Sequence, residues 1–138
     1  MNAQPTMPMA DYATSQVNLL SGLLRWRPTI EKIISRYKSM ITYNDVVHQV
    51  QHGNMYWFEN SNSFIIIQPQ TFTMGLVFHI WACGGPAVAL WELFEGSVYP
   101  VARSHNARKI TALGRSGFKK YKHPFLKPTG QQWYSMEL

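Results

Sequence analysis

The first third of the chain repeats apolar residues at the spacing of an α-helix. One apolar series predicts a helix over residues 11–26, although Gly22 weakens the pattern. A second series begins after Pro28, where Thr29 can act as the N-cap. Its apolar positions are Ile30, Ile33, Ile34, Tyr37 and Ile41. Because these side chains form one stripe, we expect the second helix to pack on a sheet.

The pattern changes from helical to extended after a third, short helix. Thr42 and Asp45 have the spacing of a capping box and predict that this helix starts there and ends at Gly53. Short apolar runs follow and predict strands at residues 55–58, 63–68 and 76–82. Turn-forming residues separate the runs, so we expect a three-stranded antiparallel meander.

A βαβ unit occupies residues 75–117. The last meander strand leads into a Gly-Gly-Pro turn at residues 84–86, and an apolar periodicity then predicts one long helix to about His105. Pro100 can kink this helix, and Asn106 can end it. The remaining predicted elements are a strand at 109–113, a helical turn at 116–121 and a closing strand at 132–137.

These elements predict an α+β protein with a mixed sheet. We divide the chain into an N-terminal arm and helix at residues 1–28 and a single domain at residues 29–138. Cys83 is the only cysteine and no apolar run reaches about 18 residues, so we expect neither an internal disulfide nor a membrane span. The N-terminus lacks the pattern of a signal peptide, which predicts synthesis in the cytoplasm.

The net charge of +6 is distributed unevenly along the 138 residues. Eight of the thirteen basic residues fall between Arg103 and Lys127, and no acidic residue lies between Glu95 and Glu137. The rest of the chain carries five basic and seven acidic residues, a net charge of −2. A basic C-terminal part suits polyanions, acidic protein surfaces or phosphate-bearing cofactors, or it is simply a solvated surface.

Three motifs resemble those of small phage-encoded proteins with the GNAT (N-acetyltransferase) fold. They are Phe-His-Ile-Trp-Ala-Cys-Gly-Gly at 78–85, Trp-Glu-Leu at 91–93 and Ile-Thr-Ala-Leu-Gly-Arg-Ser-Gly-Phe at 110–118. The resemblance covers residues 30–138 and implies a GNAT-like fold: N-terminal helices, an antiparallel meander, a βαβ crossover, a short helix and a closing strand. One fold hosts many functions, so the resemblance bears more on fold than on activity.

The turn that follows the central strand departs from the pattern of active GNAT enzymes. Those enzymes typically carry Gln or Arg followed by x-x-Gly-x-Gly or Ala, whose amides bind the cofactor pyrophosphate. Here the turn is shorter, and its Pro86 has no N–H to donate. If acetyl-CoA binds, the resemblance implies contacts from Cys83, Gly84, Gly85 and Ala87. We nevertheless expect no bound cofactor, because few donors face a pyrophosphate.

Acetyl transfer would also need an acid and a base. The resemblance implies Tyr121 as the general acid, since family enzymes often place a tyrosine after the last glycine turn. Glu59, at the end of a meander strand, is the candidate base, although its position beside Asn60 also suits a turn residue. The two residues are therefore weak catalytic candidates.

The remaining chemical candidates have ordinary structural explanations. His79 lies between two apolar residues and is interpreted as a core or sheet-face histidine. Cys83 at a glycine turn could have a lowered pKa, but a small buried thiol explains it as well. His48 and His52 are four residues apart without a further ligand motif, so we expect no metal site.

The basic C-terminal part carries candidate contacts to a polyanion or a protein partner, namely Arg115, Lys119, Lys120 and Lys122. Phe118, Tyr121 and Phe125 between these lysines have helix-like spacing. We interpret the aromatic residues as the apolar side of a short helix, with the lysines outside. Any contact with nucleic acid would then be weak and nonspecific.

The preferred hypothesis is a structural or accessory protein of a phage virion. In this hypothesis the chain has a GNAT-like fold without catalysis, and it binds neighbouring virion proteins such as portal, neck or internal components. The alternative is a small N-acetyltransferase that uses acetyl-CoA. A third possibility is a binder of nucleic-acid phosphates through the basic C-terminal part.

Overall fold

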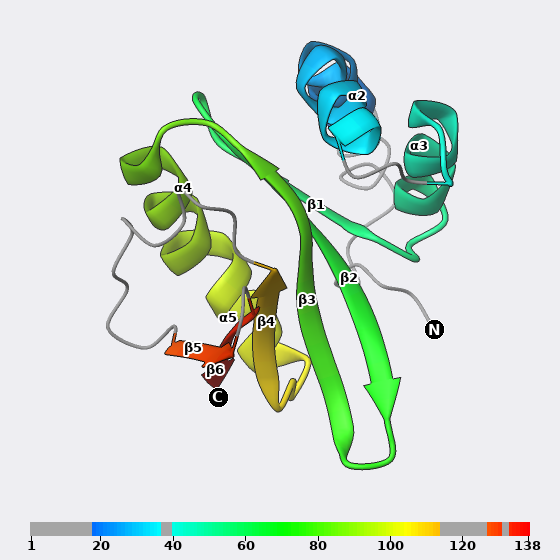
Figure 1. Ribbon diagram of the computed structural model, residues 1–138. Helices are drawn as coiled ribbons and strands as arrows, with labels where there is room; N and C mark the ends of the chain where they lie inside the picture. Colours follow the sequence, from blue (N-terminus) through cyan, green and yellow to red (C-terminus); the bar gives the residue numbers. More distant parts are fainter. Residues whose placement is uncertain (1–17, 37–39, 114–126, 131–132) are drawn as a thin grey trace.

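The computed structural model describes residues 18–36, 40–113, 127–130 and 133–138 as a mixed α+β fold (Figure 1). After a helical segment at residues 18–25, its helices are α2 (Arg27–Arg36), α3 (Tyr43–Gln51), α4 (Ala87–Leu93), the π-helical turn η1 (Phe94–Val98) and α5 (Tyr99–Ser104). Its strands are β1 (Tyr56–Glu59), β2 (Phe64–Phe72), β3 (Gly75–Gly84), β4 (Lys109–Leu113), β5 (Lys127–Gly130) and β6 (Trp133–Glu137).

The six strands form one sheet in the order β1-β2-β3-β4-β6-β5. The first three strands are an antiparallel meander, and β3 pairs with β4 in parallel through the helical crossover at residues 87–104. Strand β6 is antiparallel to β4, and β5 is antiparallel to β6. The meander, the crossover and the closing strand confirm the α+β prediction, whereas β5 was not predicted.

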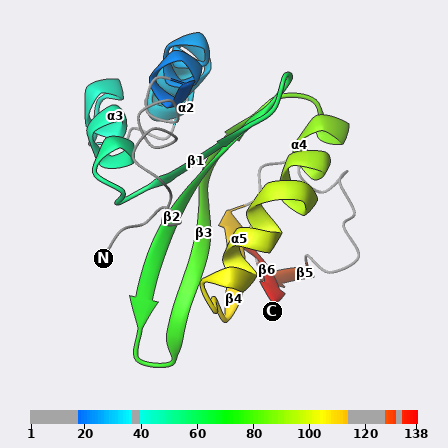
Figure 2. The ribbon, with the colours of Figure 1, turned by 180° about the vertical axis from the view of Figure 1, so that it is seen from behind.

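Helices cover both faces of the sheet, but not equally (Figures 1 and 2). Helices α4 and α5 pack on one face, where Phe94 and Val98 belong to a core cluster with Ile65 and Ile67 of β2. Helices α2 and α3 pack on the other face with a second cluster built on β1 and on the ends of β2 and β3 that lie beside β1. Successive residues of β2 therefore serve opposite cores, as the alternation of a strand requires.

Local capping signals set several helix boundaries. The capping box predicted at Thr42 is present, since Thr42 Oγ1 accepts from Asp45 N at 3.2 Å and Asp45 Oδ2 accepts from Thr42 N at 2.8 Å. The helical residues 18–25 and α2 are separated by a turn at Trp26, two residues before Pro28, whose ring removes one backbone donor. Asn106 has a φ of 57° and follows the crossover helix, as predicted.

The irregularity expected around Pro100 takes the form of a π-helical turn. The Tyr99 N–H bonds to Phe94 O across five residues, immediately before Pro100. Because proline cannot donate to the preceding turn, the wider turn lets the chain continue as helix to Ser104 instead of breaking. The prediction of one helix up to about His105 is therefore confirmed, with the distortion placed before the proline.

Strand β2 is longer than the sequence predicted. The expected strand stopped at Gln68 because Pro69 follows, but β2 continues to Phe72 and Pro69 pairs with Phe78 of β3. The neighbour on the other side, β1, pairs only as far as Ile67. Beyond that point β2 is an edge strand, where a missing N–H is tolerated.

Candidate functional site

The glycine turn between β3 and α4 is closely packed against the loop that joins β1 to β2. Gly85 has a φ of +118°, and a Cβ there would lie 2.7 Å from Ser63 Cβ and would overlap the carbonyl oxygen of Asn62. A Cβ on Gly84 would lie 2.6 Å from Phe64 Cε1 and 3.1 Å from Thr29 Cγ2. Both glycines therefore allow other parts of this chain to approach the turn closely.

Side-chain hydrogen bonds from Asn60 fix this loop in place. Asn60 Nδ2 donates to Ala89 O in the first turn of α4 at 3.0 Å. Asn60 Oδ1 accepts from Ser63 Oγ at 2.7 Å and from Asn62 N at 3.1 Å. Ser63 is fully buried. The loop at residues 60–63 is thus attached to the start of the crossover helix.

The candidate cofactor residues lie around this packed turn. Gly84 is the last residue of β3, and Ala87 is the first residue of α4. Pro86 occupies the N-cap position with no side-chain cap hydrogen bond. Cys83 is half-buried against the core cluster beneath α4 and α5, so its side chain points away from α2. The sequence suggested that the turn at residues 84–86 is a shortened anion-binding loop. In the structure the loop at residues 60–63 packs against this turn.

Glu59 lies at the end of β1, with its side chain about 24 % exposed. Its carboxylate forms an ion pair with Arg25 and packs over Gly22, where any Cβ would collide with it. The weak helical pattern at Gly22 thus has a packing reason. The proposed acid Tyr121 falls outside the described residues, as do the candidate contacts Arg115, Lys119, Lys120 and Lys122.

A different part of the sheet carries a cavity that the sequence did not predict. Helices α2 and α3 lie over β1 and the adjoining ends of β2 and β3, so no described helix covers the β2–β3 hairpin end on that face (Figures 1 and 2). A cavity of about 500 Å³ lies here, between the hairpin and β4. It is lined by Gln70, Phe72, Met74, Gly75, Val77, Arg108, Lys109 and Thr111.

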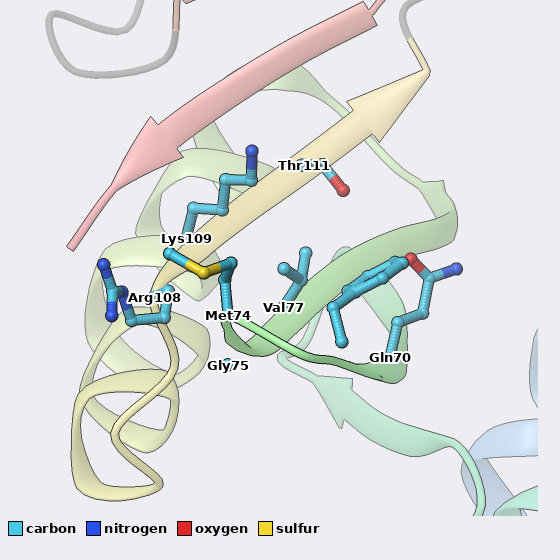
Figure 3. Close-up of a pocket in the computed structure, with 8 residues that line it drawn as sticks. Gln70, Met74, Gly75, Val77, Arg108, Lys109 and Thr111 are labelled. Carbon is cyan, nitrogen blue, oxygen red and sulfur yellow. The ribbon is translucent and has the colours of Figure 1, made fainter.

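The cavity has an apolar centre and a basic side. In Figure 3, Val77 lies centrally, with Gln70 on one side and Arg108 and Lys109 on the other. Phe72 and Met74 at the hairpin are 56 % and 76 % exposed, so two large apolar side chains are accessible side by side at this cavity. Within the described part of the chain, no acidic residue lines the cavity.

Arg108 is held beside the hairpin by backbone and side-chain contacts. Its N–H donates to Leu76 O at 2.7 Å. Its side chain crosses Gly75, where a Cβ would lie 2.5 Å from Arg108 Cγ. Gly75 has a φ of +135°, which favours glycine on conformational grounds as well. The guanidinium thus extends from a fixed point at the mouth of the cavity.

His79 connects the cavity to the middle of the sheet. The residue pairs in register with Thr111 of β4, and His79 Nδ1 lies 2.9 Å from Thr111 Oγ1. Burial lowers the pKa of His79 below its ordinary value, because the charged imidazolium loses hydration. A neutral imidazole can either accept a hydrogen bond from the Thr111 hydroxyl or donate one to it, depending on its tautomer. This position matches the interpretation of His79 as a sheet-face histidine.

The His48–His52 pair lies on α3 and at its C-terminal end. His52 Nδ1 lies 2.9 Å from His48 O, and the two rings are 4.0 Å apart. Across the described residues, no group of three or more histidine, cysteine or carboxylate side chains is close enough to hold a metal ion. Likewise, none of the helices in the described ranges is both long and apolar enough to cross a membrane.

Comparisons with known proteins give no assignment. No family model, no curated protein and no solved structure matches the chain. The functional argument therefore depends on this chain's own residues.

The signal for the uncovered face was present in β2. Residues 64–67 are Phe-Ile-Ile-Ile, apolar on both sides of the strand, whereas residues 68–71 are Gln-Pro-Gln-Thr. A change from a continuous apolar run to a polar pattern marks the point at which one face of a strand loses its cover. The turn assigned to Pro69 concealed this change.

Proposed function

We propose that this chain is a non-catalytic protein of GNAT-like fold that acts as a structural or accessory component of a phage virion. The meander, the parallel β3–β4 pair and the helical crossover support the fold part of this proposal. The virion context comes from the resemblance of the sequence motifs to small phage-encoded proteins of this fold. Exposed apolar side chains at the hairpin suit a protein that binds neighbours.

One observation carries the non-catalytic part of the proposal: the chain itself packs so closely against the glycine turn that a Cβ on Gly85 would collide with it. Asn62 O and Ser63 occupy the position that faces Gly85, and Asn60 attaches their loop to α4. In an acyl-CoA enzyme of this fold, the corresponding turn would present its amides to a pyrophosphate. Internal packing therefore explains why Gly84 and Gly85 are glycines without a bound cofactor.

Titration with acetyl-CoA tests this proposal directly. We expect no heat in calorimetry and no thermal shift at millimolar acetyl-CoA. Saturable binding at micromolar acetyl-CoA would overturn the non-catalytic assignment, because such affinities are typical of cofactor use. CoA without the acetyl group is the matched ligand for detecting pyrophosphate binding alone.

Mass spectrometry of purified particles tests the virion assignment. We expect peptides of this chain in particles, and cross-links to portal, neck or internal proteins. Absence from particles, despite expression during infection, would overturn the assignment.

A small N-acetyltransferase is the second candidate, and the β3–β4 pair favours it. Pairing between these strands ends at Ile80 and Ala112, although β3 continues to Gly84 and bulges at Trp81. Enzymes of the fold that the sequence resembles hold acetyl-CoA where these two strands part. Acetyl-CoA binding together with acetylation that is lost in Glu59→Gln would establish this candidate.

Contact with nucleic-acid phosphates is a further possibility that follows from the basic C-terminal part. The lysines concerned lie outside the described residues, so charge alone supports it. Retention on DNA that falls steeply with salt, and that is lost when Lys119, Lys120 and Lys122 are replaced together, would support this activity. Retention unchanged by that replacement would argue against these residues.

A further inference from the structure

The cavity between the β2–β3 hairpin and β4 combines apolar and basic groups in an arrangement that suits a ligand. Val77 forms its centre, and the exposed side chains of Phe72 and Met74 border it from the hairpin. A cavity of about 500 Å³ exceeds the volume of a single side chain and lies in the range of ligand pockets. An apolar group of a ligand would remove Phe72 and Met74 from water.

The charged residues in the described lining of the cavity are both cationic. Arg108 and Lys109 both line it, and neither forms an ion pair with a residue whose side chain the structure describes. Glu137 lies opposite Lys109 in the backbone register of β6 and β4. Gln70 and Thr111 add an amide and a hydroxyl to the lining. These groups can receive carboxylates and the polar backbone of an extended segment.

We propose that this cavity binds an extended peptide segment of a partner protein, in which acidic residues flank one apolar residue. The apolar side chain would occupy the space above Val77, between Phe72 and Met74, while the flanking carboxylates would meet Arg108 and Lys109. Charge complementarity selects this occupant, because the described lining has two cations and no anion. The inference specifies the partner of the interaction protein proposed above and rests on that function.

A short synthetic peptide tests the chemistry without knowledge of the partner. Labelled Ser-Glu-Leu-Glu-Ser should bind the full chain saturably, with a Kd below about 1 mM in low salt. The matched peptides Ser-Lys-Leu-Lys-Ser and Ser-Glu-Gly-Glu-Ser should each bind at least about tenfold more weakly, because one loses the charge match and the other the apolar anchor. Equal binding of all three peptides would overturn the proposal.

Two variants of equal charge locate the binding site. Arg108→Gln with Lys109→Gln should weaken binding about tenfold or more, because both cations at the cavity are lost. Lys32→Gln with Arg36→Gln removes the same charge from exposed positions on α2 and should change binding less than about twofold. Equal loss in the two double variants would mean attraction to net charge alone and would overturn the site.

A second pair of variants tests the apolar contact at Phe72 and Met74. Phe72→Ser with Met74→Ser should weaken binding about tenfold, whereas Val88→Ser, another exposed apolar residue but located on α4, should leave it unchanged. All of these positions are exposed, so circular dichroism should show a folded protein in each case. Unchanged binding in the hairpin variant would overturn the apolar contact.

These outcomes are separable from failure of the proposed function. If the chain is found in particles but binds no peptide at the cavity, the peptide inference fails and the virion function stands. If the peptide binds but the chain is absent from particles, the virion function fails while the binding chemistry stands.

Discussion

The β2–β3 ladder carries a phenylalanine opposite a glycine at each of its two ends, and the two ends have different surroundings. Phe64 pairs with Gly84 and is fully buried, whereas Phe72 pairs with Gly75 and is 56 % exposed. At the Phe64 end, Trp26 and Trp57 contact the ring with centroids 5.0 and 5.1 Å away. At the Phe72 end, the ring borders the cavity beside Arg108 and Lys109.

This difference shows that the same Phe–Gly pair becomes core or surface according to which other elements pack on it. Both glycines let an aromatic or long side chain pass close to the backbone: Phe64 at Gly84 and Arg108 at Gly75. Helix α2 and the loop at residues 60–63 turn the first pair into core. The second end, with Phe72, Gly75 and Arg108, is not covered by α2 or α3 and borders the cavity (Figure 1).

Replacing each phenylalanine by alanine should give the largest difference in stability between the two ends. We expect Phe64→Ala to lower the free energy of unfolding by about 3–5 kcal/mol, because it leaves a cavity among packed aromatic rings. Phe72→Ala should change it by no more than about 0.5 kcal/mol, since more than half of this residue is already exposed to solvent. Urea unfolding of both variants measures the difference. Similar losses would mean that the Phe72 end is also core.

The glycine turn should be the next most sensitive position. Gly85→Ala should cost about 3 kcal/mol, because alanine disfavours a φ of +118° and its Cβ would collide with the loop at Asn62. A Cβ on Gly96, in the π-helical turn, would meet no other described part of the chain within 4 Å. Gly96→Ala should therefore be neutral or stabilising by up to about 1 kcal/mol. A harmless Gly85→Ala would refute the packing role of the turn and reopen the cofactor question.

Local signals in the sequence predicted much of the fold. The capping box at Thr42 and the strand at residues 109–113 were located to the residue, because capping is local and the strand is bounded by turn residues. The continuation of β2 beyond Pro69 was missed, because it depends on where β1 stops. Strand β5 was missed because its pairing is with β6 and its sequence, Lys-Pro-Thr-Gly, has no apolar alternation.

The candidate sites were less predictable for the same physical reason. Gly85 and Ser63 are 22 residues apart, so no local pattern shows that the loop fills the turn. The cavity joins the β2–β3 hairpin to Arg108 and Lys109 through the parallel pairing of β3 with β4. Non-local contacts therefore decide both ends of the β2–β3 ladder: the closed end at Phe64, which is packed against Trp26 and Trp57, and the open end at Phe72, which borders the cavity.

Asparagine substitutions in the β1–β2 loop should have an intermediate effect. Asn60→Ala removes three hydrogen bonds, including the one to Ala89 O, and should cost about 2 kcal/mol. Asn62→Ala is the matched control, because Asn62 takes part through its backbone and its exposed side chain forms no hydrogen bond with described residues. Thermal unfolding should show a clear loss for the first variant and little change for the second. Equal effects would mean that Asn60 does not hold the closed end.

The smallest expected effect is the pH dependence contributed by His79, which lies between the two ends of β3. Its folded-state pKa is lowered from 6.5 by burial, so below pH 6.5 the unfolded chain takes up a proton that the folded chain resists. This contribution to stability is fully present above pH 6.5 and is lost as the pH falls from 6.5 through the folded-state pKa. In His79→Gln, which cannot titrate at this position, that part of the pH dependence should disappear from urea unfolding curves.

An NMR titration of the His79 ring measures how far water from the open end reaches along β3. A midpoint below 6.5 means that desolvation controls the imidazole, as expected for a ring held against Thr111 within the sheet. A midpoint at or above 6.5 would contradict this, because a well-hydrated ring would keep its ordinary pKa. The solvated region of the sheet would then extend past Thr111, and the boundary between the closed and open ends would lie nearer to the bulge at Trp81.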